Sequence, residues 1–246
     1  MRKGEPGRRT FYRVVVILGG GLAAAFVVLY TDWLPFFDLR EIEVVGNDCI
    51  PCTIIKQLAD FSVGDNLFRL PVRRACKSLS SLSWVKGVSI RRILPHRILI
   101  IIRERAAIGL IPHSEMEQEF LLLGEGGVIL EKAYVDDFPS LIIMGVGVTS
   151  DTPGTRLIDG EILSVLEYLH EKKLDRVLRS VDFSDEAYVS LEHVEDVEII
   201  LGPITGSCPK IDGLLALLGT IDPKDYHKID LRFGDEAILV PRKVVN

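Results

Sequence analysis

The sequence predicts an α+β protein with a single N-terminal transmembrane helix, a β-α-α-β-β module and a strand-rich domain that contains two helices. Three features support this: an uncharged apolar run near the N-terminus, two amphipathic helical segments followed by two β-rich runs, and alternating strand patterns in the second half. With 246 residues, 48% of them apolar and 26% charged, the chain has the composition of one or two folded domains. The net charge of −6 argues against a nucleic-acid partner, because no excess of cations is available to bind phosphates.

The first segment is an uncharged run of 18 residues between Arg13 and Asp32. As a helix with a rise of ~1.5 Å per residue, this run spans about 27 Å, close to the hydrocarbon thickness of a bilayer. We therefore expect residues 14–33, from Val14 past Tyr30, to form a transmembrane helix.

The basic tail of residues 1–13 holds five cations, so the positive-inside rule places this tail in the cytoplasm and the rest of the chain outside it. A cleaved signal peptide is the alternative. The apolar run is longer than the ~7–15 residues usual for a signal peptide, which favours an anchor that is retained.

A compact module follows the anchor. Residues 39–47 predict a strand that ends in a Gly-Asn turn, and residues 52–61 and 71–82 each place apolar side chains on one helical face. Two β-rich runs, 85–94 and 97–111, come next. Two helices can cover only one face of a three-stranded sheet, so the other face and the edges stay available.

Five short motifs occur in order within this module. They are I-x-V-x-G-N at 42–47, G-D-N-L-F at 64–68, L-x-W-V-K-x-V at 82–88, R-R-x-x-P at 91–95 and I-x-x-R-E-R at 100–105. With them, residues 37–105 resemble a POTRA domain, in particular that of the bacterial division family FtsQ/DivIB. Outer-membrane assembly proteins also carry POTRA domains, but the chain after residue 105 is too short for their barrel, whose many strands need ~10 residues each.

The second half, residues 106–241, resembles the β-domain of the same family, and residues 242–246 form a short tail. Its pattern predicts a hairpin turn, two helices, a meander of strands and a terminal hairpin. The turn lies at residues 124–127, and the two helices lie at 162–172 and 208–221. The meander covers residues 181–202, and the terminal hairpin covers residues 229–241.

We find no enzyme motif and expect no cofactor, metal or small-molecule substrate. The histidines are scattered, and the nucleotide-binding and hydrolase motifs are absent. Cys49 and Cys52 have thioredoxin spacing at a predicted helix start, where the helix dipole would lower the pKa of a thiol. The βαβ context of a thioredoxin is missing. Outside the cytoplasm Cys52 could instead pair with Cys49 or Cys76 in a structural disulfide, or all four cysteines, including Cys208, could be free.

Function is therefore expected at surfaces. The last strand alternates only weakly and is predicted to be an exposed sheet edge that accepts a strand of another chain. The resemblance implies binding of the division partners FtsB and FtsL by this hairpin and the helix before it. The predicted partner-binding residues are Arg232, Phe233, Ala237, Ile238, Leu239 and Val240. For Phe233, a place in the hairpin core is the alternative, and Asp235 and Glu236 depart from the small turn residues of the family.

The resulting hypothesis is a single-pass scaffold of the bacterial inner membrane at the division septum, which helps to control septal peptidoglycan synthesis. The alternatives are a membrane-anchored POTRA chaperone for secreted polypeptides and a thiol oxidoreductase that uses Cys49 and Cys52.

Overall fold

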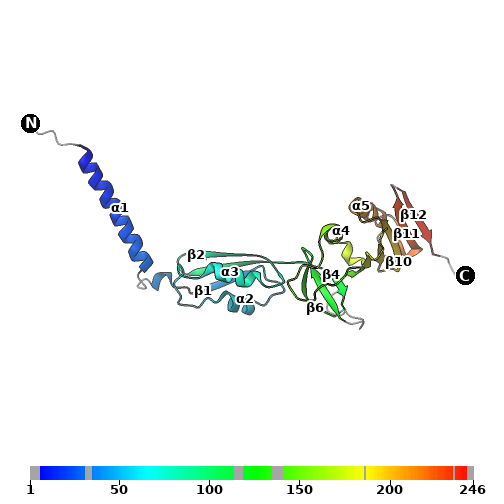
Figure 1. Cartoon of the computed structure of the whole chain (residues 1–246), viewed down its shortest axis with the longest axis horizontal. Coiled ribbons are helices and arrows are strands. Elements are labelled where there is room, and N and C mark those ends of the chain that lie inside the picture. Colours follow the sequence, from blue (N-terminus) through cyan, green and yellow to red (C-terminus); the bar gives the residue numbers. More distant parts are fainter. Residues whose placement is uncertain are drawn as a thin grey trace, which may run out of the picture. The chain divides into compact units, whose positions relative to one another are not determined.

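The computed structural model describes residues 6–30, 35–113, 119–134, 141–185, 187–234 and 236–242, with the backbone alone for 6–11, 27–30 and 35 (Figure 1). The chain divides into two compact units. One comprises residues 1–47, 51–78 and 88–102, and the other comprises residues 48–50, 79–87 and 103–246. The domain boundaries given above stay predictions.

Helix α1 spans Pro6–Tyr30 and so includes most of the uncharged run that begins at Val14. The side chains of residues 12–26 are exposed. Within the described part of the chain, no helix is both long enough and apolar enough to cross a bilayer. The predicted end of the span at residues 31–33 lies outside the described residues.

The first unit is built on a three-stranded sheet in the order β1-β3-β2, with β1 parallel to β3. Its elements follow the short helix η1 (Pro35–Phe37) and are β1 (Glu41–Val45), α2 (Cys52–Ala59), α3 (Val72–Ser80), β2 (Val85–Ile93) and β3 (Arg97–Glu104). This confirms the predicted β-α-α-β-β order.

One face of this sheet forms the core of the unit. Side chains alternate along the central strand β3, and the buried set is Ile98, Ile100 and Ile102. The helices contribute buried residues such as Ile55 and Ala75. Ile98 is fully buried whereas its neighbour Leu99 is only half-buried, so the sheet has one packed and one open face.

The second unit is built on a nine-stranded sheet in the order β12-β11-β10-β9-β8-β7-β4-β5-β6. Its strands are β4 (Ala107–Pro112), β5 (Phe120–Gly124), β6 (Val128–Ala133), β7 (Leu141–Met144), β8 (Leu178–Asp182), β9 (Val189–His193), β10 (Val197–Gly202), β11 (Tyr226–Phe233) and β12 (Glu236–Pro241). The predicted turn at 124–127 joins β5 to β6, and β8, β9 and β10 form the predicted meander.

Helices make the parallel connections of this sheet possible. α4 (Gly160–Glu171), with η3 (Leu174–Arg176), links β7 to its parallel neighbour β8. α5 (Ser207–Leu218), with η4 (Pro223–Asp225), links β10 to its parallel neighbour β11. Parallel neighbours need such long crossovers. Both predicted helices are confirmed.

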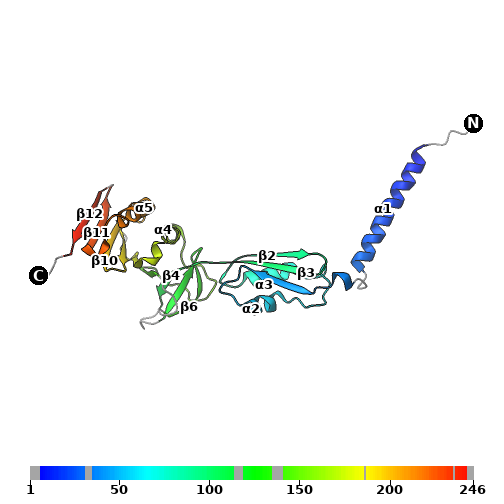
Figure 2. The ribbon, with the colours of Figure 1, turned by 180° about the vertical axis from the view of Figure 1, so that it is seen from behind.

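These two helices pack on the sheet through one large core. Val165, Leu166 and Leu169 of α4 and Ile211 and Leu214 of α5 are buried in it. Figures 1 and 2 both show α5 beside the β10-β11-β12 end of the sheet. The helix before the terminal hairpin therefore lies next to that hairpin in space.

Candidate functional site

β12 is an edge strand of the nine-stranded sheet. It pairs with β11 in antiparallel register, with Ile229 opposite Leu239 and Asp230 opposite Ile238. Among the described residues no strand lies on its other side. In an antiparallel edge strand every second residue turns its N–H and C=O outward, so this edge offers backbone groups to another chain. Pro241, which has no N–H, ends the strand.

The side chains of β12 are mostly accessible. Ala237 and Ile238 are exposed, whereas Leu239 and Val240 are half-buried. Leu239 packs against the large core and so holds the strand on the sheet. Of the four predicted strand residues, Leu239 thus anchors β12, whereas Ala237 and Ile238 are free to contact a partner.

A groove of about 700 Å³ lies between α5 and the hairpin. Its lining residues are Gly206, Pro209, Lys210, Gly213, Ala216, Leu217, Thr220, Leu231, Gly234, Glu236 and Ala237. Small residues such as Gly213 and Ala216 leave room above α5, and the Lys210 amine is already engaged, since it donates to the Leu201 carbonyl at 2.8 Å. The groove and the open edge of β12 are therefore adjacent, because Ala237 belongs to both.

Arg232 is held in a fixed position at the end of β11. Its Nε lies 2.9 Å from Oδ1 of Asp230 and its Nη2 lies 2.7 Å from Oδ2. Asp230 is buried, and these hydrogen bonds lower the pKa of its carboxyl. The guanidinium also lies 5.7 Å from the ring centroid of Tyr188 and 5.8 Å from that of Phe233.

Phe233 is not part of the hairpin core. Its side chain is 54% exposed, so the core alternative is wrong. The structure thus brings Arg232 and Phe233 together at the tip of the hairpin, with β12 starting three residues later at Glu236. Asp235 lies outside the described residues.

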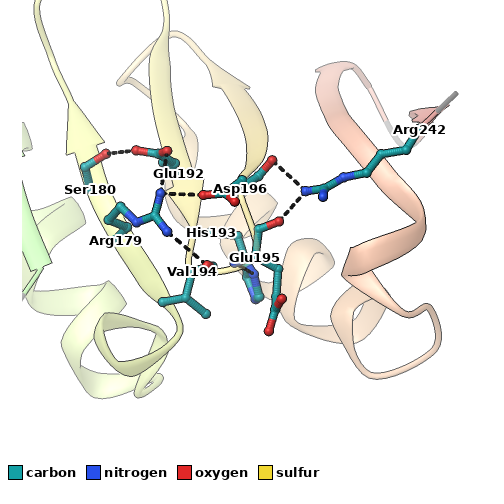
Figure 3. Close-up of polar contacts among 8 residues, drawn as sticks. All are labelled: Arg179, Ser180, Glu192, His193, Val194, Glu195, Asp196 and Arg242. Carbon is teal, nitrogen blue, oxygen red and sulfur yellow. Dashed lines mark hydrogen bonds and ion pairs between the residues drawn. The ribbon is translucent and has the colours of Figure 1, made fainter. Parts of the chain in front are cut away.

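The far end of β12 is fixed by Arg242, which sequence reasoning placed in a tail. Figure 3 shows its guanidinium reaching the turn between β9 and β10, where it donates to the carbonyls of Glu195 and Asp196. Its Nε donates to the Tyr226 carbonyl at 3.0 Å, and its backbone N–H donates to the Asp225 carbonyl at 2.9 Å. The only sequence signal for this role is an arginine directly after the last strand.

The β9–β10 turn that Arg242 holds is itself tightly bonded (Figure 3). Arg179 of β8 donates to Oδ1 of Asp196 at 2.5 Å and to the Val194 carbonyl at 3.1 Å. Nδ1 of the buried His193 accepts the N–H of Glu195 at 3.1 Å, and burial lowers the pKa of this imidazole. The turn that holds the end of β12 through Arg242 is therefore itself fixed by hydrogen bonds.

The surroundings of Cys49 differ from those that the oxidoreductase alternative assumes. All four are free, so neither alternative disulfide is present. Oε2 and Oε1 of Glu104 accept the N–H groups of Cys49 and Ile50 at 2.7 and 2.9 Å. Burial, with the nearby charge of Glu104, raises the pKa of Cys49, and so the expected lowering is wrong for this thiol. Within the described residues, no three His, Cys, Asp or Glu side chains gather in a group that would hold a metal ion.

Sequence comparison finds known proteins that are similar to this chain. Residues 37–105 match the model of the FtsQ-type POTRA domain. The chain is 25% identical over 212 residues to cell division protein DivIB of Clostridium acetobutylicum, a match that covers 83% of each chain. It is 26% identical over 239 residues to cell division protein FtsQ of Koribacter versatilis, covering 93% of this chain and 67% of the relative.

The chain thus contains an FtsQ-type POTRA domain and is similar to the cell division proteins FtsQ and DivIB. Its match to DivIB of Clostridium botulinum, strain Hall, is 27% identical over 125 residues, so it spans about half the length of that relative, 47%. The matched POTRA domain corresponds to the region of the three-stranded sheet, and the hairpin described above lies in the part that follows it.

Proposed function

We propose that this FtsQ/DivIB protein is a non-enzymatic scaffold of bacterial cell division, held in the inner membrane by α1 with its N-terminus in the cytoplasm. It binds partners of the FtsB and FtsL type at the division septum and thereby helps to control septal peptidoglycan synthesis. The names of the relatives, cell division proteins FtsQ and DivIB, support this role. The uncharged run from Val14 to Tyr30 and the basic residues before it support the anchor.

The partner chain adds a strand to β12 and places a neighbouring helix or loop over α5. Main-chain hydrogen bonds to an open edge supply affinity, and pockets for side chains supply specificity. The groove beside Ala237 gives such a pocket. Phe233 provides an exposed aromatic anchor. The ion pair with Asp230 already fixes the Arg232 side chain in the free chain, so binding costs little further side-chain entropy.

A single observation carries this proposal: an open edge strand lies beside an apolar groove and an exposed arginine–phenylalanine pair. The experiment is capture of FtsB- and FtsL-type proteins of the same bacterium by the full chain in lipid nanodiscs. We expect Phe233→Glu to weaken capture at least about tenfold, because interface hot spots each contribute about 2 kcal/mol or more. Arg232→Glu should act in the same direction.

A matched control is Val194→Glu. Val194 is an exposed apolar residue of the same unit, in the β9–β10 turn and away from the groove-lining residues. Its substitution should leave capture unchanged. Full capture by the Phe233→Glu chain would contradict the proposed surface, and capture of unrelated extended peptides with equal affinity would favour a chaperone instead.

The proposed anchor has its own test, in which protease is added to intact spheroplasts. The proposal requires cleavage of the C-terminal part while residues 1–13 stay protected. Survival of the C-terminal part would contradict the proposed orientation.

A further inference from the structure

The first unit has a distinct tip where the chain enters it from α1. We define the proximal tip as residues 36–40, 60–74 and 91–97. Backbone hydrogen bonds join its three segments: the Leu67 N–H donates to the Phe37 carbonyl at 3.0 Å, and the Arg40 N–H donates to the His96 carbonyl at 2.8 Å. Arg92 adds a side-chain link, with its Nε 2.7 Å from the Leu67 carbonyl. The tip is therefore one continuous surface.

Exposed apolar side chains gather at the proximal tip. Of the six exposed large apolar residues described between positions 36 and 105, four belong to it. These are Phe36, Val63, Phe68 and Leu94, which are 60%, 71%, 45% and 57% exposed. Phe37 packs edge-on against both phenylalanines, with ring centroids 5.2 Å apart in each pair. A packed but exposed cluster of this kind marks an interaction surface.

The same tip is cationic. It contains seven arginines against three aspartates and no glutamate. Arg73 and Arg74 are exposed on α3, whose opposite face buries Ala75 and Leu79. Within the described part of the chain, neither arginine has an acidic partner. The nearby Asp65 carboxylate is already engaged, since its Oδ2 accepts the Ser62 N–H at 2.9 Å.

The tip is tethered close to α1. Phe36 follows Tyr30 by six residues, and an extended chain spans at most ~3.6 Å per residue, so about 22 Å is the largest distance between them. If α1 is the anchor, this tether keeps the tip within reach of the bilayer surface at all times.

We propose that the proximal tip is a membrane-contacting surface. Its four exposed apolar side chains enter the interfacial layer of the bilayer, and the exposed Arg73 and Arg74 face the phosphates of anionic lipids. Apolar side chains rimmed by cations are the combination that binds such a surface. This inference rests on the proposed anchoring of α1, whose tether supplies the high local concentration that a small patch needs.

The test is hydroxyl-radical footprinting of the unmodified full chain in nanodiscs that contain phosphatidylglycerol. Phe68 and Phe233 form a matched pair, since both are phenylalanines of similar exposure, 45% and 54%, and lie in different units. We expect oxidation of Phe68 to be several-fold slower than that of Phe233. Equal oxidation rates of Phe68 and Phe233 would overturn the proposal and would favour a protein partner at the tip instead.

Leu22 of α1, which is exposed in the isolated chain, separates this inference from the proposed anchor. A protected Leu22 with an unprotected Phe68 would refute only the membrane contact of the tip. A Leu22 that is oxidised as in water would refute the anchor and the contact together.

Two matched sets of variants sharpen the result. Val63→Asp should restore oxidation of Phe68, whereas Val45→Asp, at the opposite end of β1 from the tip, should not. The combined change of Arg73 and Arg74 to Gln should weaken protection of Phe68 as much as replacing phosphatidylglycerol by phosphatidylcholine. Arg103→Gln, near the end of β3 remote from the tip, should leave protection intact. If the protection of Phe68 changed neither with these arginine substitutions nor with the lipid headgroup, the proposed role of the arginines would be overturned.

Discussion

The two edges of the nine-stranded sheet differ in how they are covered. At one edge a loop runs along β6: the Ile129 N–H donates to the Thr155 carbonyl at 2.9 Å, and the Gly154 N–H donates to the Ile129 carbonyl at 2.8 Å. At the other edge, within the described residues, no backbone group outside the hairpin bonds to β12.

The sheet thus has one covered edge and one open edge that is available for pairing. Folded proteins normally protect an edge strand, because its unpaired N–H and C=O groups recruit other chains. Here a loop protects β6, whereas β12 has no such cover among the described residues. We therefore attribute the open edge to partner binding and the covered edge to stability, and the predictions below separate these two roles.

The largest effect is expected from Gly127→Ala at the covered edge. Gly127 has φ +69, and an added Cβ would lie 1.9 Å from the Ile158 carbonyl oxygen, so the covering loop would have to move. We expect the free energy of unfolding to fall by roughly 2–4 kcal/mol, measured by urea denaturation.

Gly234→Ala in the terminal hairpin is the matched control for this change. Its φ is nearly the same, +68, but no atom lies within 4 Å of the added Cβ. Only the backbone penalty of roughly 1–2 kcal/mol applies. Equal losses for the two variants would show that the loop does not press on the β6 edge.

An intermediate effect is expected from Arg242→Ala. The change removes the side-chain hydrogen bonds to the carbonyls of Tyr226, Glu195 and Asp196 that fix the end of β12. We expect a loss of roughly 1–2 kcal/mol in unfolding free energy, together with weaker partner capture. Lys224→Ala should cost less than about 0.5 kcal/mol, because its pair with Glu195 is exposed and 3.9 Å long. An Arg242→Ala chain as stable as Lys224→Ala would rule out the clamp.

The smallest effect concerns pH at the open edge. Hydrogen bonds from Arg232 lower the pKa of Asp230, so the folded state favours the carboxylate. Its contribution to stability is complete above the ordinary aspartate pKa of about 3.9 and is lost as the pH falls through the lower folded value. The difference in unfolding free energy between the parent and Asp230→Asn should thus stay constant above about pH 5 and shrink below about pH 4. A difference that does not change down to pH 3 would mean that the ion pair is not formed.

Local patterns were sufficient to predict most elements. The apolar spacing at 52–61 and 162–172 predicted α2 and α4, and the Gly-rich segment 124–127 predicted the β5–β6 turn. The exposed last strand was also predicted from its weak alternation and its place in the chain, and the structure confirms it as an edge.

Features that depend on residues far apart in sequence could not be predicted. The parallel pairing of β10 with β11 and of β4 with β7 is set by packing across the whole unit, and no local pattern encodes it. The reach of Arg242 to the β9–β10 turn depends on that strand order. The raised pKa of Cys49 depends on its burial and on Glu104, 55 residues away in sequence, so the dipole argument from the helix start alone is misleading.

Hydrogen–deuterium exchange on the full chain, with and without an FtsB-type partner, tests the central claim most directly. The account predicts that amides of residues 237–240 in β12 become protected on binding, while amides of β6 stay unchanged. A complex in which the β12 amides exchange as fast as in the free chain would contradict strand addition at the open edge.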